Sequence, residues 1–174
     1  SCLVGSEMCK ESDIEKFRQE TGNAEATFYC LQNITLVKNT NANCFHVVDG
    51  QQRLTTLLIL LSFLQHETDS TPLLLENKLQ YSIRPETHEF ITKQVLTGHI
   101  WEKETVPERK DQYYIREVAR SIQAWFKENT ATDKGKFLEI LLSRVKLIVN
   151  VVDDKEEKIF SSLNGGKVNL DGAD

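Results

Sequence analysis

The chain has 174 residues, of which 40% are hydrophobic and 27% are charged, and these proportions are ordinary for a globular protein. Its formal net charge of −5 argues against a general electrostatic grip on nucleic acid, although it leaves room for a local basic patch. No apolar run is long enough to span a bilayer and no secretory signal is evident, so we expect one domain in the cytoplasm without a membrane association.

The first elements that we expect are a short helix and a β-hairpin. Ser12 and Glu15 form a capping-box pattern, which predicts the start of the helix. Aromatic and β-branched residues predict a strand from Phe28 to Lys38, and Asn39 to Asn43 is typical of a turn. A return strand is predicted from Cys44 to Asp49. The four cysteines lack the spacing of a metal site, so we expect Cys30 and Cys44 to be buried thiols.

A leucine-rich helix follows the hairpin. Leu54 to Leu64 is apolar on nearly every side, which is typical of a helix buried in a core. Its first turn comes directly after a polar loop, which contains Asp49, Gly50, Gln51, Gln52, Arg53, Thr55 and Thr56. The first N–H groups of a helix lack internal partners, and such an end binds phosphate readily. Arg53 adds a bidentate donor for phosphate oxygens, and Asp49 is a ligand suited to Mg²⁺.

A structural interpretation of the same loop stays open. In that interpretation Asp49 caps the helix, Gly50 makes the turn, and Arg53 pairs with Asp49. The loop is not a Walker loop, because the required glycine and lysine spacing is absent.

The middle of the chain is predicted to be mainly helical. Leu79, Tyr81 and Ile83 alternate with polar residues and predict a half-buried strand. Pro85 is placed to be the first residue of the next helix, and Gly98 its C-cap. A long amphipathic helix is predicted over 108–129, with Tyr113, Tyr114 and Trp125 beside its apolar stripe, where a core role is favoured over a ligand platform. Another helix is predicted over 134–143.

The last part of the chain returns to the sheet. Residues 144–152 predict a strand, followed by a capped helix that ends at Asn164-Gly165-Gly166. Asn164 has two open roles: it terminates this helix, where asparagine tolerates left-handed backbone angles, or its amide enters a pocket beside Arg53.

Asp49-Gly50-Gln51-Gln52-Arg53-Leu54-Thr55-Thr56, after Val47-Val48, resembles the signature of the "DGQQR" N-terminal domain of GmrSD-type modification-dependent restriction systems. Three further stretches resemble the same family: Phe28 to Gln32, the Tyr81-Ser82-Ile83-Arg84 segment, and Ile159 to Leu170, which contains Leu163-Asn164-Gly165-Gly166-Lys167. The resemblance spans residues 28–174. An N-terminal element with a Gln-Arg pair, which the family carries, has no counterpart here.

The resemblance implies an α+β fold: a small mixed sheet like that of the ParB/sulfiredoxin superfamily, a buried motif helix and a mostly helical insertion. We therefore expect residues 1–174 to be a single domain fragment. It would consist of the motif hairpin and helix (28–66), a helical part (85–143), and a return strand, helix and L-N-x-G-K element (144–174). A C-terminal nuclease domain is not included, because no H-N-H pattern occurs.

The resemblance also implies nucleoside triphosphate turnover with Mg²⁺ or another divalent cation. Asp49 would hold the metal or a water, Gln51 and Gln52 would orient the nucleophile or phosphates, and Arg53 would offset phosphate charge. The nucleotide-binding set would be Gly50, Arg53, Thr55, Thr56, Arg84, Asn164 and Lys167. The implied partners are an HNH-type nuclease domain, in the same or a partner chain, and DNA through the full-length system.

Two other functions stay open at this point. The domain is then either a nucleotide-sensing module that binds without hydrolysis, or a DNA-binding or nuclease domain. The acidic charge balance argues against the last of these.

Overall fold

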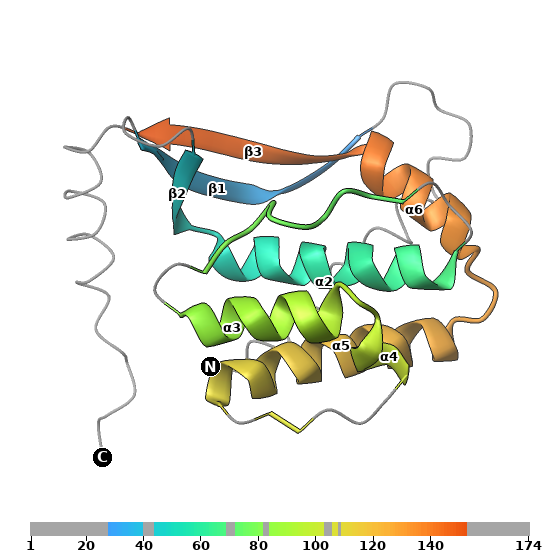
Figure 1. The fold of residues 1–174 in the computed structure, drawn as a ribbon. Helices are drawn as coiled ribbons and strands as arrows, with labels where there is room; N and C mark the ends of the chain where they lie inside the picture. The colour runs from blue at the N-terminus through green and yellow to red at the C-terminus, as the bar shows by residue number, and fades with distance from the viewer. Residues whose placement is uncertain are drawn as a thin grey trace, which may run out of the picture. The chain divides into compact units, whose positions relative to one another are not determined.

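The computed structural model describes residues 28–39, 44–68, 72–81, 84–102, 106–107 and 109–152. The predicted helix at Ser12 and all predictions beyond Val152, including those for Asn164 and Lys167, lie outside these residues. The described elements are β1 (Tyr29–Asn39), β2 (Cys44–Asp49), α2 (Gln51–Glu67), α3 (Pro85–Phe90), the π-helix η1 (Ile91–Val95), α4 (His99–Glu102), α5 (Lys110–Glu128), α6 (Lys134–Ser143) and β3 (Val145–Val152) (Figure 1). The predicted α+β fold is confirmed.

The chain divides into two compact units. One unit contains the sheet, with Cys30–Gln51 and Lys146–Asp174, and the other contains the helices, with Ser1–Tyr29 and Gln52–Val145. None of the described helices combines the length and the apolarity that crossing a membrane requires.

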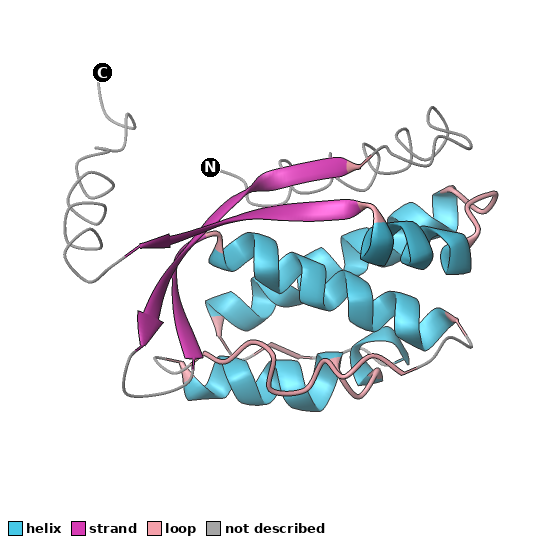
Figure 2. Cartoon of the chain, turned by 90° about the horizontal axis from the view of Figure 1, so that it is seen from above, coloured by secondary structure: helices cyan, strands magenta, loops and turns pink. Residues whose placement is uncertain are grey.

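The sheet unit has three strands in the order β2-β1-β3, drawn in magenta in Figure 2. β1 and β2 form the predicted antiparallel hairpin, in which Leu36 lies opposite Val47. The register shifts by one residue between Thr35 and Leu36, because Thr35 lies opposite Asp49. Val48 is therefore the extra residue of a β-bulge immediately before the motif, and bulges re-aim the side chains next to them.

The central strand is the buried one. Leu31, Ile34 and Val37 of β1 are each at most 5% exposed. Cys30 and Cys44 are exposed, so the prediction that they are buried thiols is wrong. Neighbouring residues of a strand point to opposite faces, and the buried Leu31 directs Cys30 the other way. A strand-forming residue type alone does not show which face it occupies.

The helical unit is built around α2. Ile59, Leu60, Phe63 and Leu64 are at most 2% exposed, which confirms the predicted buried helix. Phe63 belongs to an aromatic cluster, with its ring centroid 5.2 Å from those of both Trp101 and Phe126. The polar Ser62 is buried in the same helix because its Oγ donates a hydrogen bond to the Val95 carbonyl at 2.7 Å.

The other helices cover α2 with their apolar stripes. α5 buries Ile115, Ala119, Ile122 and Phe126, and α6 buries Phe137, Leu138 and Leu141, as predicted. Asp133 caps α6 by accepting a hydrogen bond from the Lys136 N–H at 3.0 Å.

The segment from Leu79 to Ile83 does not contain the predicted strand within its described residues. Its backbone makes local turns instead, such as Lys78 N–H to the Leu75 carbonyl at 3.3 Å and Arg84 N–H to the Tyr81 carbonyl at 3.0 Å. A strand needs a neighbour to take its backbone hydrogen bonds, and alternating hydrophobicity does not reveal one. Pro85 begins α3, as predicted. The prediction that Gly98 is the C-cap of this helix is wrong, because the C-caps of α3 and η1 are Ile91 and Leu96, although Gly98 has a positive φ of 82°. The π-helix η1, which follows α3 directly, and the short α4, which begins after Gly98, were not predicted.

Candidate functional site

The polar loop before α2 is a tight turn between a strand and a helix. β2 ends at Asp49 and α2 begins at Gln51, so Gly50 is the sole linking residue. Its φ of 93° lies in the left-handed region, where a residue with a Cβ is strained. Gln51 Nε2 donates a hydrogen bond to the Val47 carbonyl at 2.9 Å and closes the turn. The sequence therefore uses Gly50 and Gln51 to fix where α2 starts.

The first turn of α2 is polar and partly open to solvent. Gln51 and Gln52 are exposed, Arg53 and Thr55 are half-buried, and Thr56 is buried at 9% exposure. This turn contains no acidic residue. In contrast, α6 has the capping carboxylate of Asp133, and α5 has Asp111 in its first turn. The positive end of the α2 dipole is thus not balanced by an acid of its own first turn.

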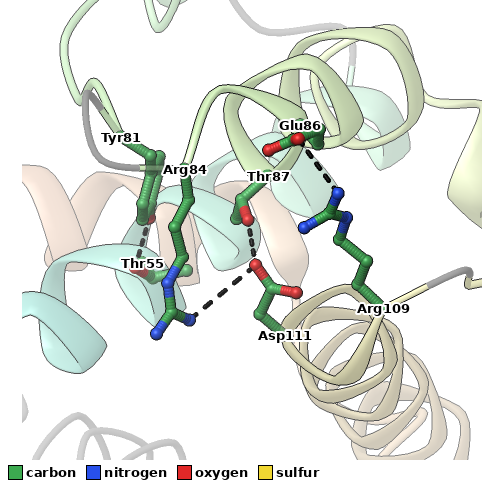
Figure 3. A network of polar contacts seen from close by, with 7 residues as sticks. All are labelled: Thr55, Tyr81, Arg84, Glu86, Thr87, Arg109 and Asp111. Atoms are coloured by element: carbon green, nitrogen blue, oxygen red, sulfur yellow. Dashed lines mark hydrogen bonds and ion pairs between the residues drawn. The ribbon is translucent and has the colours of Figure 1, made fainter.

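A second segment of the helical unit is tied to this turn (Figure 3). The hydroxyls of Thr55 and Tyr81 form a hydrogen bond between residues 26 positions apart. Burial raises the pKa of the Tyr81 phenol and the Thr55 bond lowers it, with a net increase, so the phenol stays protonated at neutral pH. Three residues after Tyr81, Arg84 is 68% exposed in its side chain. An exposed guanidinium is therefore carried by a segment that is anchored to the start of α2.

Asp111 organises the next part of the same network. The Thr87 hydroxyl donates a hydrogen bond to Asp111 Oδ2, and Arg84 Nη1 lies 3.9 Å from the same oxygen. Burial raises the pKa of Asp111, but hydrogen bonds from Thr87 and from backbone N–H groups, with the charge of Arg84, outweigh it and lower the pKa overall. The carboxylate is consequently charged at neutral pH and holds one side of the Arg84 fork (Figure 3).

A second ion pair joins α3 and α5 nearby. Arg109 Nη2 lies 3.0 Å from Glu86 Oε1, and both side chains are about half exposed, at 57% and 46%. Exposed pairs of this kind contribute about 0 to 1 kcal/mol. The Arg109–Glu86 pair therefore links the starts of the two helices and contributes little to the free energy of unfolding.

The structure places the predicted site residues in three groups. Gln52, Arg53, Thr55, Thr56 and Arg84 all lie in the helical unit, where the Thr55–Tyr81 bond brings the Arg84 segment to α2. Asp49, Gly50 and Gln51 belong to the sheet unit. Asn164 and Lys167 lie outside the described residues.

The predicted metal ligand has no cluster of acids around it. Within the described residues no group of three or more His, Cys, Asp or Glu side chains is arranged to hold a metal ion. Mg²⁺ in nucleotide sites commonly uses one or two carboxylates together with phosphates and water. Asp49 alone is therefore compatible with a metal that arrives with a nucleotide, and unsuited to a metal held by protein ligands alone.

Sequence reasoning did not find Asp111, Thr87 or the Tyr81 hydroxyl bond. Thr87 and Asp111 belong to no local motif, and although Tyr81 lies in a segment that resembles the family, its bond partner Thr55 is 26 positions away. A weak signal was present in Asp111 itself, because an acid in the first turn of a long helix favours the positive dipole end. Nothing in the sequence indicated that this helix end would lie beside Arg84.

A family model described as "GmrSD restriction endonuclease, N-terminal domain" matches residues 10–174. No match was found among curated proteins or among solved structures. The expected likeness to the ParB/sulfiredoxin superfamily therefore stays a prediction.

Proposed function

Because the chain belongs to the family of GmrSD restriction endonuclease N-terminal domains and so has a role in a restriction system, we propose that it is the part that binds a nucleoside triphosphate. The family implies a nuclease domain and DNA in the full-length system. In the proposal, this domain contributes nucleotide binding to the full-length system. With a divalent cation it also hydrolyses the nucleotide.

One observation carries the proposal: the first turn of the 17-residue helix α2 is polar, partly exposed and free of acidic residues, and the segment that carries the exposed Arg84 is tied to α2 by the Tyr81–Thr55 hydrogen bond. Backbone N–H groups and the helix dipole favour an anion at such an end. Arginine forks match phosphate oxygens geometrically. The buried middle of α2 makes the helix rigid, so the donors are positioned before the ligand arrives.

Each residue has a role in this proposal. Arg53 and Arg84 bind phosphate oxygens, while Thr55 and Thr56 donate hydroxyl hydrogen bonds or, in the case of Thr55, hold the Tyr81 segment. Asp49 is the carboxylate that would hold Mg²⁺, which supplies charge neutralisation to the phosphates when it is bound. Gln52 is exposed and orients a phosphate or water.

Calorimetric titration with each of the four triphosphates in the presence of Mg²⁺ tests binding directly. We expect saturable binding of at least one of them with a single site. A phosphate-release assay on the same nucleotide then measures hydrolysis. Absence of binding for all four triphosphates would contradict the proposal.

The matched variants are Arg53→Ala and Arg120→Ala. Arg120 is an exposed arginine of α5 that lies nine residues, or about 13 Å of helix, beyond Asp111. Arg53→Ala is expected to abolish binding and turnover while circular dichroism remains that of the wild type. Arg120→Ala is expected to retain both. Equal turnover in wild type and Arg53→Ala would remove the phosphate role of Arg53.

A nucleotide switch without hydrolysis is the second candidate function. Its support is the hydrogen bond from Gln51 Nε2 to the Val47 carbonyl, which gives this amide a structural role in the turn. That role competes with orienting a nucleophile. Triphosphate binding without phosphate release is the result that this candidate predicts.

A further inference from the structure

The solvent face of the first three turns of α5 carries two exposed aromatic side chains. Tyr113 is 45% exposed and Tyr114 is 36% exposed, so the core role that the sequence favoured for them is wrong. Successive residues of a helix are about 100° apart, and the stripe of Ile115, Ala119 and Ile122 takes the buried side. The two tyrosines fall outside that stripe and face water.

Cations lie over both rings. Lys110 Nζ is 5.9 Å from the Tyr114 ring centroid, and the guanidinium carbon of Arg116 is 5.2 Å from that of Tyr113. The two rings pack edge to face, with centroids 5.8 Å apart and planes at 72°. Such contacts restrain the side chains and keep the aromatic surface ordered in water.

The local charge of this segment is opposite to that of the whole chain. Residues 109–120 contain four basic residues, Arg109, Lys110, Arg116 and Arg120, and two acidic ones, in a chain whose net charge is −5. Both acids are engaged, and three of the four bases are paired as well: Arg109 with Glu86, and Arg116 and Arg120 with Glu117. Asp111 accepts the Thr87 hydrogen bond, and Glu117 Oε1 lies 3.4 Å from both Arg116 Nη2 and Arg120 Nη1.

We propose that this tyrosine and cation face of α5 binds nucleic acid, with the basic side chains on phosphates and Tyr113 or Tyr114 stacked on an unpaired base. The face offers the two features that binding of single strands uses: positive charge along the backbone and aromatic surface for bases. The faces of the bases in an intact duplex are stacked on one another, so a tyrosine ring finds no base face to cover. The expected ligand is therefore a single strand or a duplex with an extruded base, and the proposal is independent of nucleotide binding at α2.

The test is fluorescence anisotropy of the 174-residue chain with a labelled single-stranded oligonucleotide and with its duplex, across a series of salt concentrations. We expect the single strand to bind more tightly. The double variant Tyr113→Ala/Tyr114→Ala should lose about 10-fold in single-strand affinity, whereas Tyr113→Phe/Tyr114→Phe, which keeps both rings, should retain it. Lys110→Ala/Arg120→Ala should lower affinity for both probes and reduce the salt slope by about two.

Two controls localise the effect. Phe45 is an exposed aromatic residue of β2 at 51% exposure, and Lys127 is a basic residue in the last turn of α5. Phe45→Ala and Lys127→Ala should bind like the wild type. The proposal is overturned if the wild type binds neither probe, if the phenylalanine variants lose as much as the alanine variants, or if the controls weaken binding equally. It is also overturned if the face captures a protein and no nucleic acid.

Discussion

The first turn of α2 and the middle of the same helix have opposite surroundings. Ile59, Phe63 and Leu64 are sealed by the other helices of their unit, whereas Gln51 and Gln52 are exposed and the residues after them carry polar contacts. The middle of the helix has contacts in every direction and no polar group available to a ligand. The start carries polar side chains that reach solvent, Gln51 and Gln52 among them. One helix thus provides both the rigidity of the helical unit and the surface on which we place the nucleotide.

The largest effect is expected from breaking the buried half. Phe63→Ala removes a buried ring that packs against both Trp101 and Phe126 and leaves a cavity, so the free energy of unfolding should fall by about 3 to 5 kcal/mol. Leu74→Ala is the control, because Leu74 is 82% exposed and its loss should change stability by less than about 0.5 kcal/mol. Urea unfolding measures both. Similar values for the two variants would show that α2 is not the centre of the core.

An intermediate effect is expected from the carboxylate that organises the Arg84 network. Asp111→Ala removes the acceptor of the Thr87 hydrogen bond and should cost about 1 to 3 kcal/mol at neutral pH. Since the pKa of Asp111 is lowered in the folded protein, this contribution is present above the usual carboxyl pKa and disappears as pH falls through the lower, folded value.

Urea unfolding at a series of pH values from neutral to acid measures that dependence. The difference between wild type and Asp111→Ala should shrink below about pH 4. Glu139→Ala, an exposed acid of α6, should change stability by less than about 0.5 kcal/mol at every pH. A pH-independent difference for Asp111→Ala would mean that its charge has no part in the network.

The smallest effect is expected from the link between α2 and the Arg84 segment. Tyr81→Phe removes one hydroxyl and its bond to Thr55, and should cost about 0.5 to 1.5 kcal/mol of stability. Triphosphate affinity should also fall, because Arg84 is less firmly anchored. Tyr114→Phe, which removes an exposed hydroxyl, is the control in the same calorimetric and unfolding measurements. If Tyr81→Phe lowered the free energy of unfolding but left triphosphate affinity unchanged, Arg84 would have no part in the nucleotide site.

The elements that the sequence predicted correctly are those that depend on local patterns. β2 and α6 match their predicted bounds, because these elements follow from local hydrophobic periodicity and capping residues. The strand expected at Leu79 to Ile83 is absent from the described part of that segment, residues 79–81, since a strand needs a pairing partner and local alternation does not reveal one. Tyr113 and Tyr114 were assigned to the core from their residue type, because residue type does not show whether a side chain lies on the buried or the exposed side of a helix.

The site was predictable only where it is local. The run from Asp49 to Arg53 lies at a strand–helix junction, as its sequence of strand formers, glycine and leucine-rich helix indicated. Arg84 was named from a resemblance, whereas the bond that anchors its segment joins residues 26 positions apart. Asp111 has no motif and acquires its role only when the start of α5 meets the start of α3.

The most direct test of a phosphate site at the start of α2 is solution NMR of the ¹⁵N-labelled chain during titration with a non-hydrolysable triphosphate and Mg²⁺. We predict the largest chemical-shift changes at the backbone amides of residues 51–54, and little change at residues 134–136, the start of α6, where Asp133 already accepts a backbone hydrogen bond. Saturable shifts that are centred elsewhere, or no shifts at residues 51–54, would contradict the account.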